Sequence, residues 1–322
     1  MSIEMNEANT LIERIIAEVE KAIIGKRFAL QKILAAFLAS GGHVLLEDYP
    51  GLAKTLTASS FAAALGLSFK RIQFTPDLLP GDITGGYIYD RVHNQFVLRK
   101  GPVFANIILA DEVNRASPRT QSALLEAMQE FQVTIEGETM PLPEPFIVIA
   151  TQNPIEYEGT FPLPEAQLDR FIMKLSLGYP SQEEEQQILS RRQERQSDAF
   201  SLQAVTDAEG VLALRQLTET VHVDADIERY IVQIVAATRQ HRHVAVGASP
   251  RAALALLKLS RAWAVMQGRS YVLPDDIKLF TAPVLIHRLI LQPEFWSNRG
   301  AVQSVIEEVL GSTPVPVIPG EE

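Results

Sequence analysis

Residues 43–56 read HVLLEDYPGLAKTL, and this stretch decides the fold. A short apolar strand, a loop containing Pro50-Gly51 and an apolar helix that begins with Lys54-Thr55 follow one another without a gap. A phosphate-binding loop needs this order, because the backbone N–H groups of the loop and the helix N-terminus both favour an anion. Lys54 is placed to reach the β- and γ-phosphates of a nucleotide, and the Thr55 hydroxyl to bind Mg²⁺.

The match to the phosphate-loop motif G-x-x-x-x-G-K-[ST] is incomplete. When the motif is aligned on Lys54, Asp48 and Ala53 stand where it has glycine. On this stretch alone, an ordinary strand–turn–helix that carries a lysine explains the pattern as well as a phosphate loop does. If the loop does bind phosphate, the residues that surround it are Asp48, Tyr49, Pro50, Gly51, Leu52, Ala53, Lys54, Thr55 and Leu56.

A second segment favours the phosphate-loop interpretation. The apolar strand Asn106–Ala110 is followed directly by Asp111-Glu112. In a parallel sheet, ligands bind at the carboxyl ends of the strands, so an acidic pair at that point is placed for chemistry. Asp111 is a candidate to hold Mg²⁺ through water, and Glu112 to orient and deprotonate an attacking water. The alternative is a strand stop followed by a helix cap.

Three further residues are candidates with simpler alternatives. Asn153 follows the strand Phe146–Ala150 and is placed to hydrogen-bond a γ-phosphate or the attacking water, although Asn before Pro is often a turn residue. Arg170 precedes a fifth strand and is either an ion-paired surface residue or a cation aimed at a phosphate. Arg251 falls in the first turn of a helix, where the dipole disfavours a cation, so we expect it to have an anionic partner.

The order of elements predicts two domains. Strands alternate with helices up to Gly178, which is typical of a parallel α/β sheet with right-handed crossovers. We therefore predict an α/β core over residues 1–178 and a smaller, all-helical domain with an extended tail over 179–322. Two β-hairpins are expected to project from the core, at Tyr87–Leu98 and Val133–Met140.

Composition excludes several classes of protein. With 47% apolar and 21% charged residues among 322, the chain has enough apolar residues for a core and is not disordered. The net charge of −10 argues against a general nucleic-acid binder, and the lack of cysteine removes disulfides and thiolate metal sites. No apolar run reaches the roughly 18 residues needed to span a bilayer. We expect a cytoplasmic protein without membrane insertion.

The histidines do not suggest a metal site. His241 and His243 lie two residues apart after a predicted helix, while His43 and His287 are isolated from acidic residues in the sequence. Zinc sites usually combine such ligands at recognisable spacings. We therefore predict that metal ligation is confined to Thr55 and Asp111.

Taken together, these segments resemble the AAA+ ATPases and, within them, the MoxR family. The resemblance runs from about Ile24 to about Leu310, nearly the whole chain. The stretches that carry it are HVLLEDYPGLAKT (43–55), LADEVNRASPRTQSALLEAMQE (109–130), ATQNP (150–154), PEAQLDRF (164–171) and GASPRA (247–252). It implies an AAA+ P-loop NTPase core with a five-stranded parallel sheet, followed by a helical lid.

The resemblance also implies a role for each matched residue. Lys54 and Thr55 look like Walker A, Asp111 and Glu112 like Walker B, Asn153 like sensor 1, and Arg251 like sensor 2. Arg170 looks like the arginine finger, with Arg115 as the second candidate, and Ile24-Gly25-Lys26 resembles the segment that packs near the adenine. By the same resemblance, catalysis rests on Glu112, Arg170, Asn153 and Lys54, with ATP and Mg²⁺ as the bound groups.

One departure from the family pattern concerns Asp48, where the family usually has glycine. Asp can adopt the left-handed backbone that glycine would supply. Its carboxylate would repel a polyphosphate unless it is turned away. The sequence therefore predicts that Asp48 weakens nucleotide binding without abolishing it.

The function implied by the resemblance is ATP hydrolysis in a ring, most simply a hexamer. Such rings remodel or mature partner proteins, often ones with a von Willebrand factor A-type domain, and assist the insertion of metal cofactors. An inactive nucleotide-binding scaffold is one alternative, against which the intact Lys54, Glu112 and Arg170 argue. A DNA-acting or magnesium-chelatase-like motor subunit is another. Basic residues on the first hairpin favour a DNA motor. The acidic pair Glu136 and Glu138 on the second hairpin argues against one.

Overall fold

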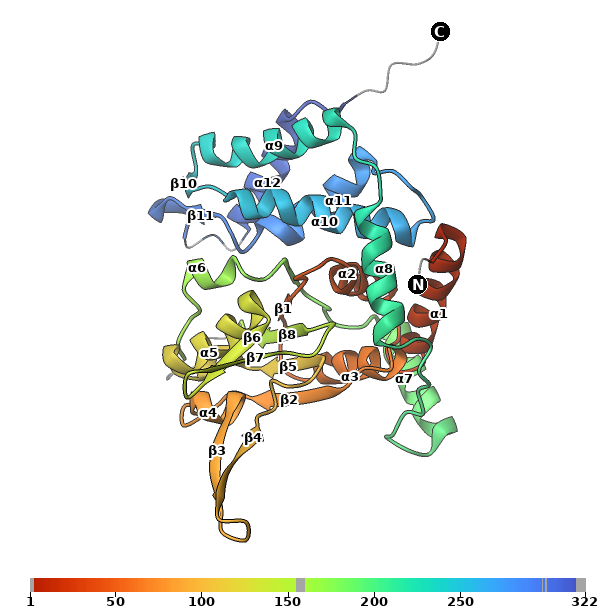
Figure 1. Cartoon of the computed structure of the whole chain (residues 1–322). Helices are drawn as coiled ribbons and strands as arrows, with labels where there is room; N and C mark the ends of the chain where they lie inside the picture. The colour runs from red at the N-terminus through yellow and green to blue at the C-terminus, as the bar shows by residue number, and fades with distance from the viewer. Residues whose placement is uncertain (1–2, 155–159, 297, 299, 317–322) are drawn as a thin grey trace.

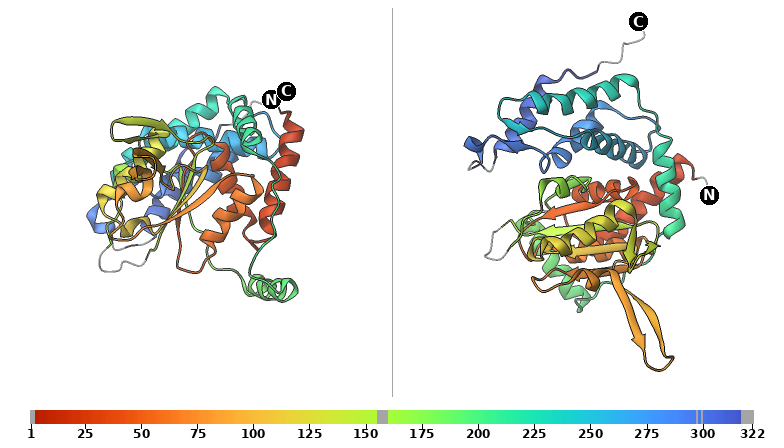
Figure 2. Two further views of the ribbon diagram at one scale, coloured as in Figure 1. Left: turned by 60° about the horizontal axis from the view of Figure 1, so that its bottom comes forward. Right: turned by 60° about the vertical axis from the view of Figure 1, so that its left-hand side comes forward.

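The computed structural model describes residues 3–154, 160–296, 298 and 300–316. Figure 1 shows two layers: an α/β layer below, which contains the main sheet, and a helical lid above it. The helix α8 (Ala208–Glu219) stands beside both layers and packs against α2 (Arg27–Leu38) and α10 (Pro250–Met266). The right-hand view in Figure 2 shows the same separation of sheet and lid.

The main sheet has five parallel strands, as the sequence predicts. Their order across the sheet is β2-β5-β8-β1-β9. The neighbouring inner strands β5 and β8 are built almost entirely of buried residues, as expected for strands covered on both faces. The strands are β1 (Val44–Glu47), β2 (Phe69–Gln73), β5 (Ile107–Asp111), β8 (Ile147–Gln152) and β9 (Met173–Leu175).

Alternate side chains of each strand enter two different apolar clusters. Val44 and Leu46 of β1 belong to the cluster that includes α1 (Met5–Glu20), α2 and α3 (Lys54–Ala64), and this cluster continues into the lid. Leu45 belongs to the other cluster, which includes α5 (Pro118–Glu130). The period of two in the strands thus explains how one sheet is covered by helices on both faces.

Both predicted hairpins are present. The first consists of β3 (Gly85–Asp90) and β4 (Gln95–Lys100), preceded by the short helix α4 (Pro80–Thr84), and it projects away from the body of the molecule (Figures 1 and 2). The second consists of β6 (Gln132–Ile135) and β7 (Glu138–Pro141) and lies along the α/β layer. The remaining short elements of this layer are η1 (Val113–Arg115) and α6 (Glu165–Leu168).

The second half of the chain is mainly helical, with one addition that the sequence does not predict. Strands β10 (Val244–Val246) and β11 (Ile290–Leu291) pair antiparallel within the lid. The pair is too short to leave a period-two pattern, which explains the omission. The helices here are α7 (Gln182–Arg195), α8, α9 (Ala225–Gln240), α10, α11 (Pro274–Leu285), η2 (Pro293–Phe295) and α12 (Ala301–Ser312).

The boundary between 178 and 179 stays a prediction. Helix α7 lies beside the α/β layer, where Arg191 donates to the backbone oxygen of Glu20 at the end of α1. Helix α12 runs to Ser312, so the predicted tail follows it, and residues 317–322 of that tail lie outside the described part of the chain. Among the described residues, no helix combines the length and apolar character needed to cross a bilayer.

Candidate active site

The loop after β1 has the geometry of an anion site. Two of its residues, Gly51 and Ala53, have positive φ, at 85° and 53°. Ala53 immediately precedes α3 and has no side-chain oxygen, so it cannot cap the first backbone N–H groups of that helix. These groups and the positive end of the helix dipole face the loop, which is the arrangement that binds phosphate.

Asp48 is not one of the left-handed residues, so the expectation that it replaces a left-handed glycine was wrong. Its carboxylate is buried and accepts three hydrogen bonds from the segment between β9 and α7. The donors are the Ser176 hydroxyl at 2.6 Å, the Leu177 N–H at 2.7 Å and the Gly178 N–H at 3.1 Å. The carboxylate is therefore held by residues 176–178, and its weakening of nucleotide binding stays a prediction.

Lys54 is folded back onto its own loop. Its ammonium donates to the backbone oxygen of Asp48 at 2.5 Å and to that of Tyr49 at 3.3 Å. Burial lowers the pKa of Lys54, against the opposite effect of the Asp48, Asp111 and Glu112 carboxylates. A phosphate that enters the loop offers this ammonium a charged acceptor in place of two neutral carbonyl groups.

Asp111 ends the buried strand β5, and its carboxylate accepts three hydrogen bonds. Arg71 of the neighbouring strand β2 donates to it twice, at 2.6 and 3.1 Å, and the Thr151 hydroxyl of β8 donates at 2.6 Å. Carboxylate and hydroxyl oxygens are the ligands that Mg²⁺ prefers, so Asp111 together with the exposed Thr55 hydroxyl fits that ion. In this structure, Arg71 supplies the positive charge beside Asp111.

Glu112 lies just beyond β5 in a left-handed conformation, with φ of 56°. Its carboxylate accepts from the Gln73 amide at 3.0 Å and from the Arg115 guanidinium at 2.8 Å. Its backbone N–H donates to the Thr151 hydroxyl at 2.8 Å. The second candidate for an arginine finger, Arg115, is thus paired with a carboxylate of its own chain.

Sequence reasoning missed Arg71, Gln73 and Thr151 as partners of the acidic pair. They come from β2 and β8, the two neighbours of β5, and Gln73 lies opposite Asp111 in the register. The strand order alone makes them neighbours, and it cannot be read from a single sequence. Asn153 follows β8 at the same sheet edge, as predicted, so the carboxyl ends of β1, β5 and β8 bring Lys54, Asp111, Glu112 and Asn153 to one edge.

Arg170 and Arg251 do not lie at this edge of the sheet. Both line a cavity of about 260 Å³ together with His43, the residue that precedes β1. The Ile172 N–H bonds the backbone oxygen of His43, which places the chain after Arg170 at the amino end of β1. Lys54 follows the carboxyl end of that strand, and four strand residues span about 13 Å. Within one chain, these arginines therefore lie at the opposite end of β1 from the phosphate loop.

The anionic partner expected for Arg251 is Asp169. Its carboxylate lies 4.0 Å from the Arg251 guanidinium, accepts from the Ser249 hydroxyl at 3.0 Å and binds the buried Arg288 at 2.7 Å. Because Asp169 adjoins Arg170 and precedes β9, these bonds fix the start of α10 against the α/β layer. The 260 Å³ cavity also contains Lys258, so its charged lining is mostly cationic.

Residues 24–26, the segment predicted to lie near an adenine, approach the phosphate loop through Tyr179. Lys26 donates to the backbone oxygen of Tyr179 at 2.8 Å and lies 3.6 Å from the Glu184 carboxylate. The Tyr179 ring in turn lies 6.0 Å from the ring of Tyr49 in the loop. Lys26, the phosphate loop and Tyr179 therefore converge, and the sequence did not reveal the exposed Tyr179 as a neighbour of the loop.

The larger cavity, of about 660 Å³, is distinct from this loop. It lies between the sheet edge and the lid and is lined by residues of both, among them Glu47, Gln152, Lys174 and Trp296. Lys174 and Glu47 form an ion pair of 2.6 Å across the neighbouring strands β9 and β1. This space separates the α/β layer from the end of the lid that carries β10 and β11.

Comparisons with known proteins agree with this geometry. Residues 43–173 match the model of the ATPase family associated with various cellular activities, and residues 236–309 match the model of the AAA lid domain. These matches define the class: an AAA+ ATPase, an enzyme that hydrolyses ATP.

Relatives that match over nearly the whole chain identify the family within this class. The chain is 47% identical to the protein YeaC of Bacillus subtilis over 97% of both chains, and 44% identical to the chaperone MoxR1 of Mycobacterium tuberculosis over 97% of this chain and 84% of that one. A solved structure of a protein assigned as an ATPase from Cytophaga hutchinsonii matches with a TM-score of 0.90 and 42% identity, over 97% of both chains. The chain belongs to the MoxR family of AAA+ ATPases.

Proposed function

We propose that this chain hydrolyses ATP at sites shared between neighbouring subunits of a ring, most simply a hexamer, and couples the cycle to the remodelling of partner proteins. The observation that carries the proposal is the separation of the cationic cavity around Arg170 and Arg251 from the loop around Lys54. A head-to-tail contact between identical chains brings the cavity of one subunit to the loop of the next, and a closed ring satisfies every such contact.

Each residue then has a defined task. Lys54 leaves the carbonyl oxygens of its loop and binds the β- and γ-phosphate oxygens, while the first N–H groups of α3 hold the phosphates in place. Thr55 and Asp111 would hold Mg²⁺, and the ion would neutralise phosphate charge there. Glu112 takes a proton from the attacking water, which Asn153 orients.

Arg170 from the neighbouring subunit stabilises the charge that develops on the transferred phosphoryl group, a contribution of about 10³–10⁵ in rate for arginines supplied in trans. Arg251 reaches the same nucleotide from the neighbour's lid. Neither residue acts within its own subunit, so an isolated chain has an incomplete site.

The lid is the part that converts the nucleotide state into movement. Asp48 ties the phosphate loop to residues 176–178, so a change in the loop is passed to the start of the lid. We propose that the lid rotates about residues 178–181 and that the hairpin β3–β4 contacts the partner protein. The exposed side chains of this hairpin include Ile88, Tyr89, Val92 and Phe96, between 49% and 86% exposed. Exposed apolar side chains along a projecting ribbon suit contact with a protein surface.

The partner class follows from the family. The relative MoxR1 is named a chaperone, and the resemblance implies client proteins with a von Willebrand factor A-type domain or ones that acquire a metal cofactor. We propose this activity for the chain as well.

A second candidate is a chain that binds nucleotide and stays silent until a partner binds. The observation that favours it is the state of the acidic pair, since Arg71 occupies Asp111 while Gln73 and Arg115 occupy Glu112. Hydrolysis needs both carboxylates released from these cations and amides.

Steady-state ATP hydrolysis measured against protein concentration separates the two candidates. Shared sites predict a specific activity that rises with concentration and is lost in Glu112→Gln and in Arg170→Ala. Nucleotide binding without hydrolysis at every concentration would instead support the silent chain. A specific activity that is constant with dilution, in a chain shown to be monomeric, would contradict the shared site.

A further inference from the structure

A cluster of three potential metal ligands lies in the lid, far from the nucleotide site in the sequence. His241 follows the last residue of α9, His243 lies two residues later, and Glu308 is on α12. One ligand atom from each side chain lies within 4.8 Å of the others. The sequence pattern argues against metal binding by these histidines because the carboxylate stands 67 residues beyond His241, and only the fold brings it close.

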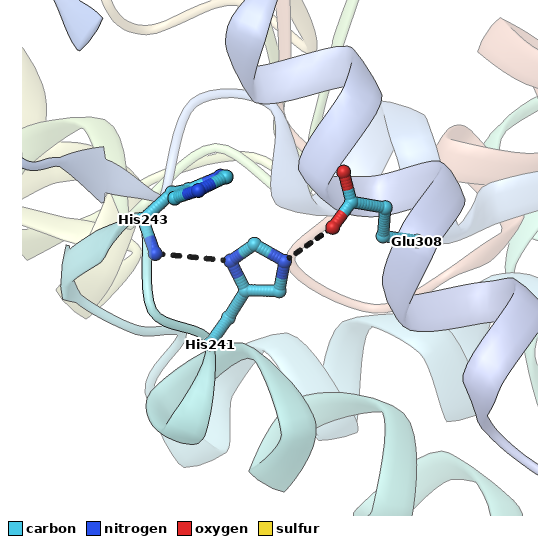
Figure 3. A group of neighbouring side chains, drawn as sticks. All are labelled: His241, His243 and Glu308. Carbon is cyan, nitrogen blue, oxygen red and sulfur yellow. Dashed lines mark hydrogen bonds and ion pairs between the residues drawn. The ribbon is translucent and has the colours of Figure 1, made fainter.

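The three side chains lie close together and are partly or largely exposed. Figure 3 shows the His241 ring pointing toward Glu308, with the His243 ring beside it. His241 Nε2 lies 3.0 Å from Glu308 Oε2, and the two imidazole rings lie 5.1 Å apart. The side chain of His241 is 13% exposed and that of Glu308 is 54% exposed, so an ion can enter from solvent.

The positions of the histidines are fixed by backbone hydrogen bonds and ring packing. The Val244 N–H bonds the backbone oxygen of His241 at 3.0 Å, and the Gln292 N–H bonds that of His243 at 2.9 Å. The His243 ring also lies 4.3 Å from the ring of Phe295. Because the turn is held on both sides, the ligands lose little freedom on binding, which is a condition for an effective metal site.

The carboxylate is equally well positioned. Helix α12 buries Val305, Ile306 and Val309 in the lid core, and Glu308 follows on the adjacent exposed position of the same turn. The helix cannot rotate Glu308 away from His241 without exposing these apolar residues. The carboxylate is therefore presented to the histidines by the packing of the lid.

We propose that His241, His243 and Glu308 bind a divalent transition-metal ion, Zn²⁺ above all. Two imidazole nitrogens, one carboxylate oxygen and a water molecule complete the tetrahedral coordination that zinc favours. Imidazole ligands select zinc, copper or nickel over Mg²⁺ and Ca²⁺, so this site does not compete for the magnesium of the nucleotide site. The ion would tie the turn between α9 and β10 to α12.

Binding requires one rearrangement that the geometry allows. His241 Nδ1 accepts a hydrogen bond from the His243 N–H at 3.3 Å, so a neutral ring carries its proton on Nε2, facing Glu308. Metal coordination through Nε2 moves that proton to Nδ1 and opens the contact with the backbone N–H. This contact is long for an N–H···N bond, so its loss is small compared with a metal–ligand bond.

Calorimetric titration of the full-length chain with zinc chloride alone tests the proposal. We expect one zinc ion per chain, and more than about tenfold weaker binding in Glu308→Gln and in His243→Ala. His222→Ala is the matched control, since this histidine is exposed and its contacts in the lid are made through its backbone. Glu112→Gln is a second control that removes a carboxylate at the nucleotide site.

A thermal unfolding experiment with and without zinc supplies an independent readout. A bound ion raises the unfolding temperature of the wild type and of both controls, because it binds only the folded lid. The increase should be lost in Glu308→Gln, whose stability without zinc shows whether the variant is folded. The proposal is overturned if the wild type takes up no zinc, or if Glu308→Gln and His243→Ala bind it as tightly as the controls do.

Discussion

Replacing Asp48 by glycine distinguishes an anchoring carboxylate from a repelling one. The buried carboxylate accepts hydrogen bonds from Ser176, Leu177 and Gly178. Asp48→Gly leaves the two backbone N–H groups without an acceptor, while the Ser176 hydroxyl can turn to water. Each unsatisfied buried donor costs about 1–3 kcal/mol, so we expect the free energy of unfolding to fall by about 2–6 kcal/mol.

Nucleotide affinity should change in the same variant. The loop loses its tether to residues 176–178, so we expect ATP to bind more weakly in Asp48→Gly.

Asp48→Asn keeps one acceptor oxygen and should lose about half as much stability as Asp48→Gly does. Ser176→Ala removes a single donor and should cost about 1 kcal/mol.

The assay combines urea unfolding, followed by circular dichroism at one protein concentration, with equilibrium binding of a fluorescent ATP analogue. If Asp48→Gly unfolds within about 0.5 kcal/mol of the wild type and binds ATP more tightly, the anchoring role is refuted. That result would restore electrostatic repulsion as the main effect of Asp48.

Three further predictions follow from single residues. Burial lowers the pKa of His43 from 6.5 to about 4, so the folded state disfavours protonation of this imidazole. Its contribution to stability is therefore complete above pH 6.5 and is lost as the pH falls toward 4, by about 3 kcal/mol in all. Urea midpoints at several pH values should show a steeper loss than in a His43→Gln variant, with His222→Gln unchanged from the wild type. Gly51→Ala places a side chain at φ of 85° and should destabilise the chain by about 1–2 kcal/mol, measured by urea unfolding; an unchanged midpoint would contradict that backbone conformation. Arg115→Ala should reduce hydrolysis far less than Arg170→Ala, whose rate should fall by about 10³-fold or more; equal losses in steady-state assays would argue against Arg170 as the arginine finger.

The sequence predicts the sheet and the residues at the carboxyl ends of its strands well, because both rest on local patterns. The strand that precedes Lys54 and the strand that ends at Asp111 are apolar runs bounded by polar residues, and parallel strands place such ends at one edge. Side-chain contacts between strands cannot be predicted in this way. Arg71 reaches Asp111 only because β2 lies beside β5, and a single sequence does not contain that order.

Side-chain direction and distant packing were also beyond the sequence. The direction of the Asp48 carboxylate depends on where residues 176–178 pass, and that follows from the position of β9 beside β1. The meeting of His241 with Glu308 depends on the packing of α12 against α9. In both cases the sequence shows the residue itself and does not show which distant residue it contacts.

The most direct test of the shared site is a mixing experiment with two inactive variants. Glu112→Gln lacks the base and Arg170→Ala lacks the arginine, so each variant alone should show no hydrolysis. In an equal mixture that assembles at random, about a quarter of the interfaces combine an intact Glu112 with an intact Arg170 from the neighbour. We predict that about a quarter of the wild-type activity returns. With co-assembly verified by native mass spectrometry, a mixture that stays inactive, or an Arg170→Ala variant that is active alone, would contradict a site completed by the neighbouring subunit.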